Sequence, residues 1–184
     1  MFKKIDHVVL IHGFGTSSEN VWFPWLHREL ESRGIRVTAP TMPNALRPDY
    51  KTWMRLGKPI AEGWSSRTLV IGHSLGGAFA LRLLQHHAKS RLAGVILVSP
   101  LFAANFSVKP LIEFFQQPID WKLLRKRARR VQIIHAKDDP LVPFDHGMRY
   151  AEALNGELHL FSKGSHFHQR KLPFLLKTLL PYIE

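Results

Sequence analysis

Short apolar runs alternate along the chain with longer stretches whose apolar residues recur at helical spacing. Runs of about four to eight β-branched or apolar residues predict strands, and a period of about 3.6 predicts amphipathic helices. Strands are expected at Asp6–Ile11, Ile35–Ala39, Thr68–Ile71, Gly94–Val98, Val131–His135 and Glu157–Phe161. Helices are expected at Trp22–Ser32, Lys51–Ala61, Leu75–Ala88, Trp121–Arg127, Phe144–Leu154 and His168–Ile183. This alternation is typical of an α/β fold with about six mainly parallel strands and helices on both faces.

The stretch 99–120 fits this alternation poorly. Its prolines interrupt any single helix, and its phenylalanines make it too apolar for a bare surface loop. One interpretation is a small cap or pocket wall, with Phe102 and Phe106 as candidates for the substrate pocket. The other is that these side chains complete the core, and the sequence leaves both open.

The composition narrows the class of protein. A chain of 184 residues with 45% apolar residues predicts one domain, 1–184. The absence of cysteine excludes disulfides, thiolate zinc sites and a cysteine nucleophile. No apolar run approaches the roughly 20 residues that span a bilayer, and the first run lacks a signal-peptide cleavage site. We therefore expect a cytoplasmic protein without a transmembrane segment.

The chain is strongly basic. It carries 26 Lys and Arg against 14 Asp and Glu, a net charge of +12, which favours contact with anions. The most basic segment is Lys122–Arg130, and no nucleic-acid-binding motif accompanies it. We interpret it as a solvated helix end before a buried strand and expect no nucleic-acid binding. The oligomeric state stays open.

The most specific motif is Gly72-His73-Ser74-Leu75-Gly76-Gly77, which lies between an expected strand and an expected helix. In this context a GxSxG sequence forms a tight turn that exposes the serine hydroxyl, and its glycines leave room for close backbone packing. The start of the helix also favours negative charge near that hydroxyl. Ser74 is therefore the candidate nucleophile.

A serine hydroxyl needs a base to take its proton, and the base needs a carboxylate to orient it. Asp139 and His166 follow the fifth and sixth expected strands, in the order serine, acid, histidine that this motif requires. Asp138 and His168 compete with them as neighbours. Asp139 is favoured because a Pro-Leu-Val-Pro turn follows it, and His166 because Gly-Ser precedes it.

The negative oxygen of a tetrahedral intermediate needs hydrogen-bond donors. The backbone N–H of Leu75 is one candidate, and that of Phe14, in the loop His12-Gly13-Phe14-Gly15, is the other. His12 and His73 are interpreted as scaffold or substrate-pocket residues. Because His86 and His87 are adjacent and Asp145-His146 lacks a second ligand at helical spacing, we expect no metal and no organic cofactor.

On these motifs the sequence resembles the α/β-hydrolase superfamily, and within it compact serine hydrolases similar to the retinoblastoma-binding serine hydrolase family. The likeness runs along nearly the whole chain, including the glycine loop, GHSLGG, Asp138-Asp139-Pro140 and Gly164-Ser165-His166-Phe167. It implies a compact single-domain α/β-hydrolase without a large lid, with its catalytic triad at Ser74, Asp139 and His166.

Three functions compete. The complete set of nucleophile, base, acid and oxyanion loop favours a carboxylesterase-like serine hydrolase that cleaves a small acyl ester or thioester through an acyl-enzyme. An amidase or peptidase would share the same first step, so the sequence does not separate the two. A protein-binding module on a hydrolase scaffold would be indicated by a missing triad member, and none is missing.

Overall fold

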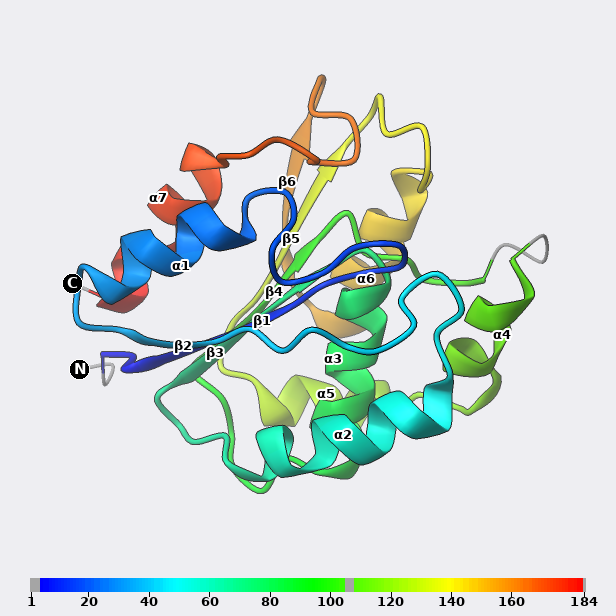
Figure 1. Ribbon diagram of the computed structural model, residues 1–184, viewed down its shortest axis with the longest axis horizontal. Coiled ribbons are helices and arrows are strands. Elements are labelled where there is room, and N and C mark those ends of the chain that lie inside the picture. Colours follow the sequence, from blue (N-terminus) through cyan, green and yellow to red (C-terminus); the bar gives the residue numbers. More distant parts are fainter. Residues whose placement is uncertain (1–3, 105–107, 184) are drawn as a thin grey trace.

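The computed structural model describes residues 4–104 and 108–183, and Phe106 lies outside them. Within this part of the chain, six strands form one parallel sheet in the order β2-β1-β3-β4-β5-β6 (Figure 1). They are β1 (His7–Ile11), β2 (Arg36–Thr38), β3 (Thr68–His73), β4 (Gly94–Val98), β5 (Val131–Ala136) and β6 (Glu157–Phe161). The predicted α/β sheet is confirmed, and the carboxyl ends of its strands share one edge, where open α/β sheets bind ligands.

Helices cover both faces of the sheet. The helices α1 (Phe23–Glu31) and α7 (Pro173–Ile183) lie on one face, and α2 (Tyr50–Glu62), α3 (Leu75–His86), α5 (Trp121–Arg127) and α6 (Asp145–Leu154) lie on the other (Figure 1). A further helix, α4 (Lys109–Gln116), flanks the second group. None of the helices in the described residues is long and apolar enough to cross a membrane.

Two helices differ from the prediction. The last helix begins at Pro173 rather than at His168, because proline suits the first turn of a helix, where its missing N–H costs no hydrogen bond. The helix α4 was not predicted, because the prolines of 99–120 were interpreted as interruptions. Pro110 instead occupies the first turn of α4, where the same reasoning makes it compatible with a helix.

The core on the α3 face is organised around Trp53. Its ring is fully buried and meets the rings of His12, Phe79 and Phe114 edge to face. Such pairs add about 1 kcal/mol each beyond the area they bury. Because Phe114 belongs to α4 and is fully buried, this part of 99–120 completes the core.

A buried arginine ties α3 to the end of α4. The Arg82 side chain donates to three backbone carbonyl oxygens, those of Phe114 at 3.1 Å, Pro118 at 3.0 Å and Gln117 at 2.5 Å. The residue is only 1% exposed. The last carbonyl groups of a helix have no hydrogen-bond donors within the helix. The Arg82 guanidinium supplies donors to these groups at the C-terminal end of α4.

Candidate active site

Ser74 lies on the tight turn between β3 and α3. Its backbone has φ 54° and ψ −123°, a conformation that costs an L-residue about 1–3 kcal/mol. A Cβ at Gly72 would lie 2.6 Å from the carbonyl oxygen of Gly76, and one at Gly76 would overlap the carbonyl oxygen of Ile11. The two glycines therefore allow the close packing that holds this turn, as the motif predicted.

The glycine loop after β1 lies directly against this turn. A Cβ at Gly13 would lie 2.9 Å from the Ser74 Cβ and 3.3 Å from the Leu75 nitrogen. Leu75 begins α3, where backbone N–H groups have no acceptor within the helix. The residue next to Gly13 is Phe14, so both candidate oxyanion donors belong to segments that meet beside Ser74.

His12 holds the glycine loop in place and is not open to solvent. Its ring is 0% exposed, its Nδ1–H donates to the carbonyl oxygen of Gly13 at 2.9 Å, and its Nε2 accepts from the backbone N–H of Met42 at 2.8 Å. Burial lowers the pKa of His12. Of the two interpretations left open by the sequence, these contacts favour a scaffold role.

Asp139 and His166 are joined by a hydrogen bond. The Nδ1–H of His166 donates to the Asp139 carboxylate at 2.8 Å and 3.0 Å, and the carboxylate is 0% exposed. The backbone N–H groups of Leu141 and Val142 donate to the same carboxylate at 2.9 Å and 3.0 Å. The structure thus brings together the two residues that the sequence selected after β5 and β6, and no hydrogen bond within the described residues occupies the His166 Nε2.

A second histidine, His135, also contacts the Asp139 carboxylate. Its Nε2 lies 3.4 Å from Oδ2 of Asp139 and 3.1 Å from the carbonyl oxygen of Val142. Burial acts to raise the pKa of Asp139, but the hydrogen bonds from His135, His166 and the Val142 backbone outweigh it and hold that pKa below its usual range. The carboxylate therefore stays charged, although it is buried. His135 was not among the predicted site residues, and its position four residues before Asp139 was the available signal.

Asp138, the neighbour that competed with Asp139, binds the backbone of another loop. Its Oδ1 accepts from the backbone N–H groups of Gly164 at 2.9 Å and Ser165 at 2.8 Å. Those residues directly precede His166. Asp138 therefore ties the loop after β5 to the loop that carries the candidate base.

We predict that Asp138→Ala will lower kcat for ester hydrolysis by about tenfold and leave KM nearly unchanged, because a loosened loop misplaces His166. Asp138→Asn keeps an acceptor oxygen for the two N–H groups and should recover most of the lost rate. Steady-state kinetics on a nitrophenyl ester distinguish these results. Full kcat in Asp138→Ala would show that the loop holds its position without this carboxylate.

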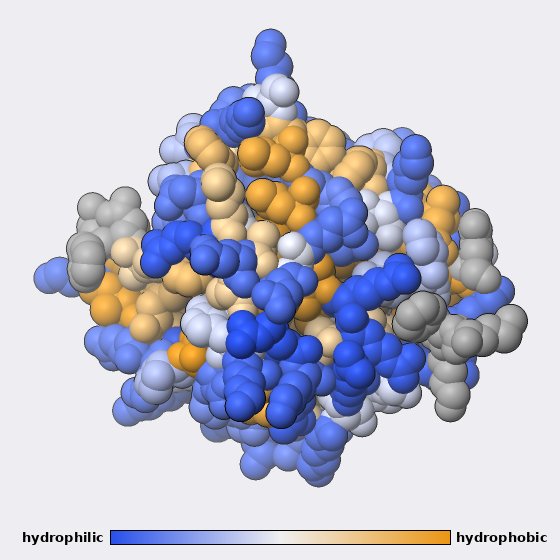
Figure 2. All heavy atoms as spheres, turned by 180° about the vertical axis from the view of Figure 1, so that it is seen from behind, coloured by the Kyte–Doolittle hydropathy of each residue, from blue (hydrophilic) through white to orange (hydrophobic). Residues whose placement is uncertain are grey.

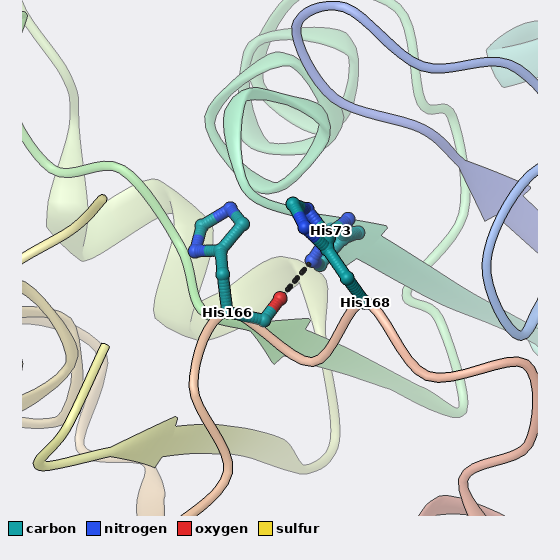
Figure 3. Close-up of side chains that lie close together, drawn as sticks. All are labelled: His73, His166 and His168. Atoms are coloured by element: carbon teal, nitrogen blue, oxygen red, sulfur yellow. Dashed lines mark hydrogen bonds between the residues drawn. The ribbon is translucent and has the colours of Figure 1, made fainter. Parts of the chain in front are cut away.

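Three histidine rings lie together at this edge, from the end of β3 and the loop before α7 (Figure 3). The Nε2–H of His73 donates to the carbonyl oxygen of His166 at 2.9 Å, and His73 is 1% exposed. Burial, aided by the nearby His166, lowers the pKa of His73 to about 3. His73 is thus a neutral scaffold residue that contacts the loop carrying His166. In the chain it directly precedes the candidate nucleophile, Ser74.

The same three residues, His73, His166 and His168, each offer one nitrogen within 4.8 Å of the others. This group was not among the candidates weighed when no metal was expected. In both His73 and His166 one ring nitrogen already has a partner, because His73 Nε2 donates to a carbonyl oxygen and His166 Nδ1 donates to Asp139. A metal-free site stays a prediction.

Phe102 packs beside the β4 end of the site rather than standing free. Its ring stacks on Trp121 at 5.6 Å between centroids, and its backbone N–H donates to Nδ1 of His146 at 3.1 Å. The guanidinium of Arg149 lies 4.1 Å from the centre of the Phe102 ring. Phe102 is half-buried, so its role in a substrate pocket stays a prediction.

A cavity of about 630 Å³ opens beside the glycine loop. It is lined by residues 15–17, Asn20 and residues 44–47, which include the 72% exposed side chain of Leu46. Gly15 follows the candidate donor Phe14 in the glycine loop, whereas Ser74 is not among the residues that line this cavity. No motif marks residues 44–47, so they were not among the predicted site residues.

The fold and the serine turn define the class of protein, an α/β-hydrolase. The family model for serine hydrolases matches residues 8–171, and the chain belongs to this family. It is 32% identical to the hydrolase YdeN of Bacillus subtilis (strain 168) over 96% of each chain, and 23% identical to the serine hydrolase RBBP9 of Rattus norvegicus over 91% of this chain and 89% of that one.

Solved structures agree with this assignment. The crystal structure of the B. subtilis ydeN product matches with a TM-score of 0.91 at 31% identity, covering 96% of this chain and 98% of that chain. The monoacylglycerol lipase of Paleococcus ferrophilus matches with a TM-score of 0.73 at 18% identity, over 98% of this chain and 97% of that chain, which shows the shared fold. The resemblance stated from the sequence is confirmed at the level of superfamily and family.

Proposed function

We propose that this serine hydrolase cleaves a small acyl ester or thioester through an acyl-enzyme on Ser74. The observation that carries the proposal is the buried hydrogen bond from His166 Nδ1–H to Asp139, which fixes the tautomer and leaves Nε2 free to accept a proton. The depressed pKa of Asp139 keeps the orienting group charged, which stabilises the imidazolium that forms.

The reaction would proceed in two stages. As the Ser74 hydroxyl attacks the acyl carbon, its proton passes to His166 Nε2, and the N–H groups of Leu75 and Phe14 donate to the negative oxygen. Collapse of the intermediate breaks the bond to the alcohol or thiol, which takes the proton from His166. A water molecule activated by the same base then releases the acid and restores Ser74.

The cavity beside the glycine loop supports a small substrate. Its apolar wall at Leu46 and Ala45 suits an acyl or alcohol group of modest size, and its lining residue Gly15 follows the proposed donor Phe14 in the chain. The chemistry assigns no role to a metal or an organic cofactor. A cytoplasmic location, expected from the sequence, is part of the same proposal and would be tested by cell fractionation.

Labelling by a fluorophosphonate probe tests the proposal directly. We expect wild-type protein to be labelled covalently and Ser74→Ala to show no labelling, whereas Ser32→Ala, which removes an exposed serine after α1, should be labelled as the wild type is. Nitrophenyl esters of increasing acyl length and the matching nitroanilides would then separate esterase from amidase activity. Folded wild-type protein that neither reacts with the probe nor hydrolyses any ester would refute the proposal.

A further inference from the structure

A second cavity, of about 410 Å³, lies at the opposite edge of the sheet from Ser74. It is lined by Arg91, Arg125, Ala128, Arg129, Arg130, Val131, Gln132, Leu154, Asn155 and Glu157. Val131 begins β5, whereas Ala136, near Asp139, ends it, so the two sites are separated by about 16 Å of extended strand. The basic segment singled out in the sequence therefore forms one wall of a hollow that the proposed hydrolysis does not use.

Backbone pairing holds the segments that carry Arg91 and Arg129 next to each other. The segment before β4 pairs with the segment before β5 through a parallel bridge between Leu92 and Ala128. The Leu92 N–H donates to the carbonyl oxygen of Arg127 at 2.7 Å, and the Arg129 N–H donates to that of Leu92 at 3.1 Å. Arg91 and Arg129 thus flank a fixed bridge, and bringing them together costs little further chain entropy when a ligand binds.

The arginines of the cavity differ in what they contact. Arg125 Nη1 donates to the carbonyl oxygen of Ala153 at 2.6 Å, and the Arg130 guanidinium lies 5.9 Å from the centre of the Tyr182 ring. No hydrogen bond or ion pair joins the exposed side chains of Arg91 and Arg129 to the described part of the chain. These two guanidinium groups therefore keep their donors for a ligand.

The charge in the cavity is unbalanced. Among the lining residues Glu157 is the single carboxylate, and it faces four arginines. Glu157 is 66% exposed and lies 3.6 Å from His159 Nε2, and no ion pair in the described residues joins it to Arg91 or Arg129. Figure 2 shows the back of the molecule, where strongly hydrophilic side chains gather over the region in which α5 lies.

We propose that this cavity binds a small ligand through its phosphate groups, chiefly by Arg91 and Arg129. Guanidinium groups donate two parallel hydrogen bonds to phosphate oxygens, and an arginine pair fixed by the backbone matches that geometry. The concave shape favours a free phosphorylated metabolite or a single projecting headgroup over a flat or rod-shaped polyanion. The proposal is independent of the reaction at Ser74, because the site lies at the other edge of the sheet.

Calorimetric titration with pyrophosphate at constant ionic strength tests the site. We expect saturable binding by the wild type, and a loss of affinity of about tenfold or more in Arg91→Gln/Arg129→Gln, equal to about 1.4 kcal/mol. The control Arg55→Gln/Lys58→Gln removes the same charge from the exposed face of α2 and should bind as the wild type does. Glu157→Gln should bind several-fold more tightly, because it removes a negative charge that opposes the ligand.

Vesicles separate the two sources of phosphate. Co-sedimentation with phosphatidylcholine vesicles containing phosphatidic acid, lost in Arg91→Gln/Arg129→Gln but retained in the α2 control, would assign the site to a lipid headgroup. Pyrophosphate binding without vesicle binding would assign it to a free metabolite. The proposal is overturned if wild-type protein does not bind pyrophosphate, or if both double variants lose affinity equally, since net charge alone would then explain the binding.

Discussion

Ser74→Ala will lower kcat/KM for ester hydrolysis by about a thousandfold or more, and His166→Ala will lower it by a comparable factor. The hydroxyl is a weak nucleophile unless its proton is removed during attack, so losing either group removes the same step. The double variant Ser74→Ala/His166→Ala should therefore be no slower than Ser74→Ala alone. Progress curves on one nitrophenyl ester measure all three rates.

The comparison requires that the variants fold. Ser74→Ala keeps the Cβ on the turn and should give the circular dichroism spectrum of the wild type. The Ser32→Ala control should retain the wild-type rate, because that serine is exposed and lies outside the candidate site. A Ser74→Ala protein that retained a tenth of the wild-type activity would assign the nucleophile to another residue.

Arg82→Leu will reduce the free energy of unfolding by about 3 kcal/mol. This second large effect concerns the stability of the protein rather than its rate of hydrolysis. The substitution leaves the carbonyl oxygens of Phe114, Gln117 and Pro118 without their buried donor. An orphaned buried acceptor costs about 1 kcal/mol or more, and leucine offers no hydrogen bond in return. Urea denaturation followed by tryptophan fluorescence measures the shift in midpoint.

Two controls make this result specific. Arg28→Leu removes an exposed arginine from α1 and should change stability by about 0.5 kcal/mol or less. Arg82→Lys keeps a charged donor, but the compact lysine ammonium cannot reach all three carbonyl oxygens. The stability of this variant should therefore lie between those of the wild type and Arg82→Leu. A midpoint for Arg82→Leu equal to that of Arg28→Leu would mean that water or a shifted α4 satisfies these carbonyls.

Local patterns in the sequence predicted most of the sheet and the positions of the candidate site residues. The four inner strands are short buried runs, and the turn at Ser74 is encoded by glycines that lie within two residues of it, so both depend on neighbours in the chain. Asp139 and His166 could be chosen because parallel strands deliver their following loops to one edge. The hydrogen bond that joins these two residues is a property of the fold.

Contacts between distant segments could not be predicted in the same way. Arg82 is a charged residue in a stretch with the periodicity of an amphipathic helix. The carbonyl oxygens that it binds lie more than thirty residues away, in α4 and directly after it, and α4 was itself not predicted. Likewise, Asp138 gave no sign that it would accept hydrogen bonds from the loop before His166. In both cases the pairing depends on how helices and loops dock on the sheet, which single-sequence periodicity does not encode.

The left-handed backbone at Ser74 has a consequence for evolution. Glycine adopts φ 54° without the steric conflict that a Cβ creates, so the turn would be more stable with glycine in place of serine. The serine therefore costs the fold stability, and the proposed role of Ser74 as nucleophile would explain why it is retained. A lineage that no longer used this site would gain stability from a single replacement, so a glycine at this position would mark a descendant that had abandoned catalysis.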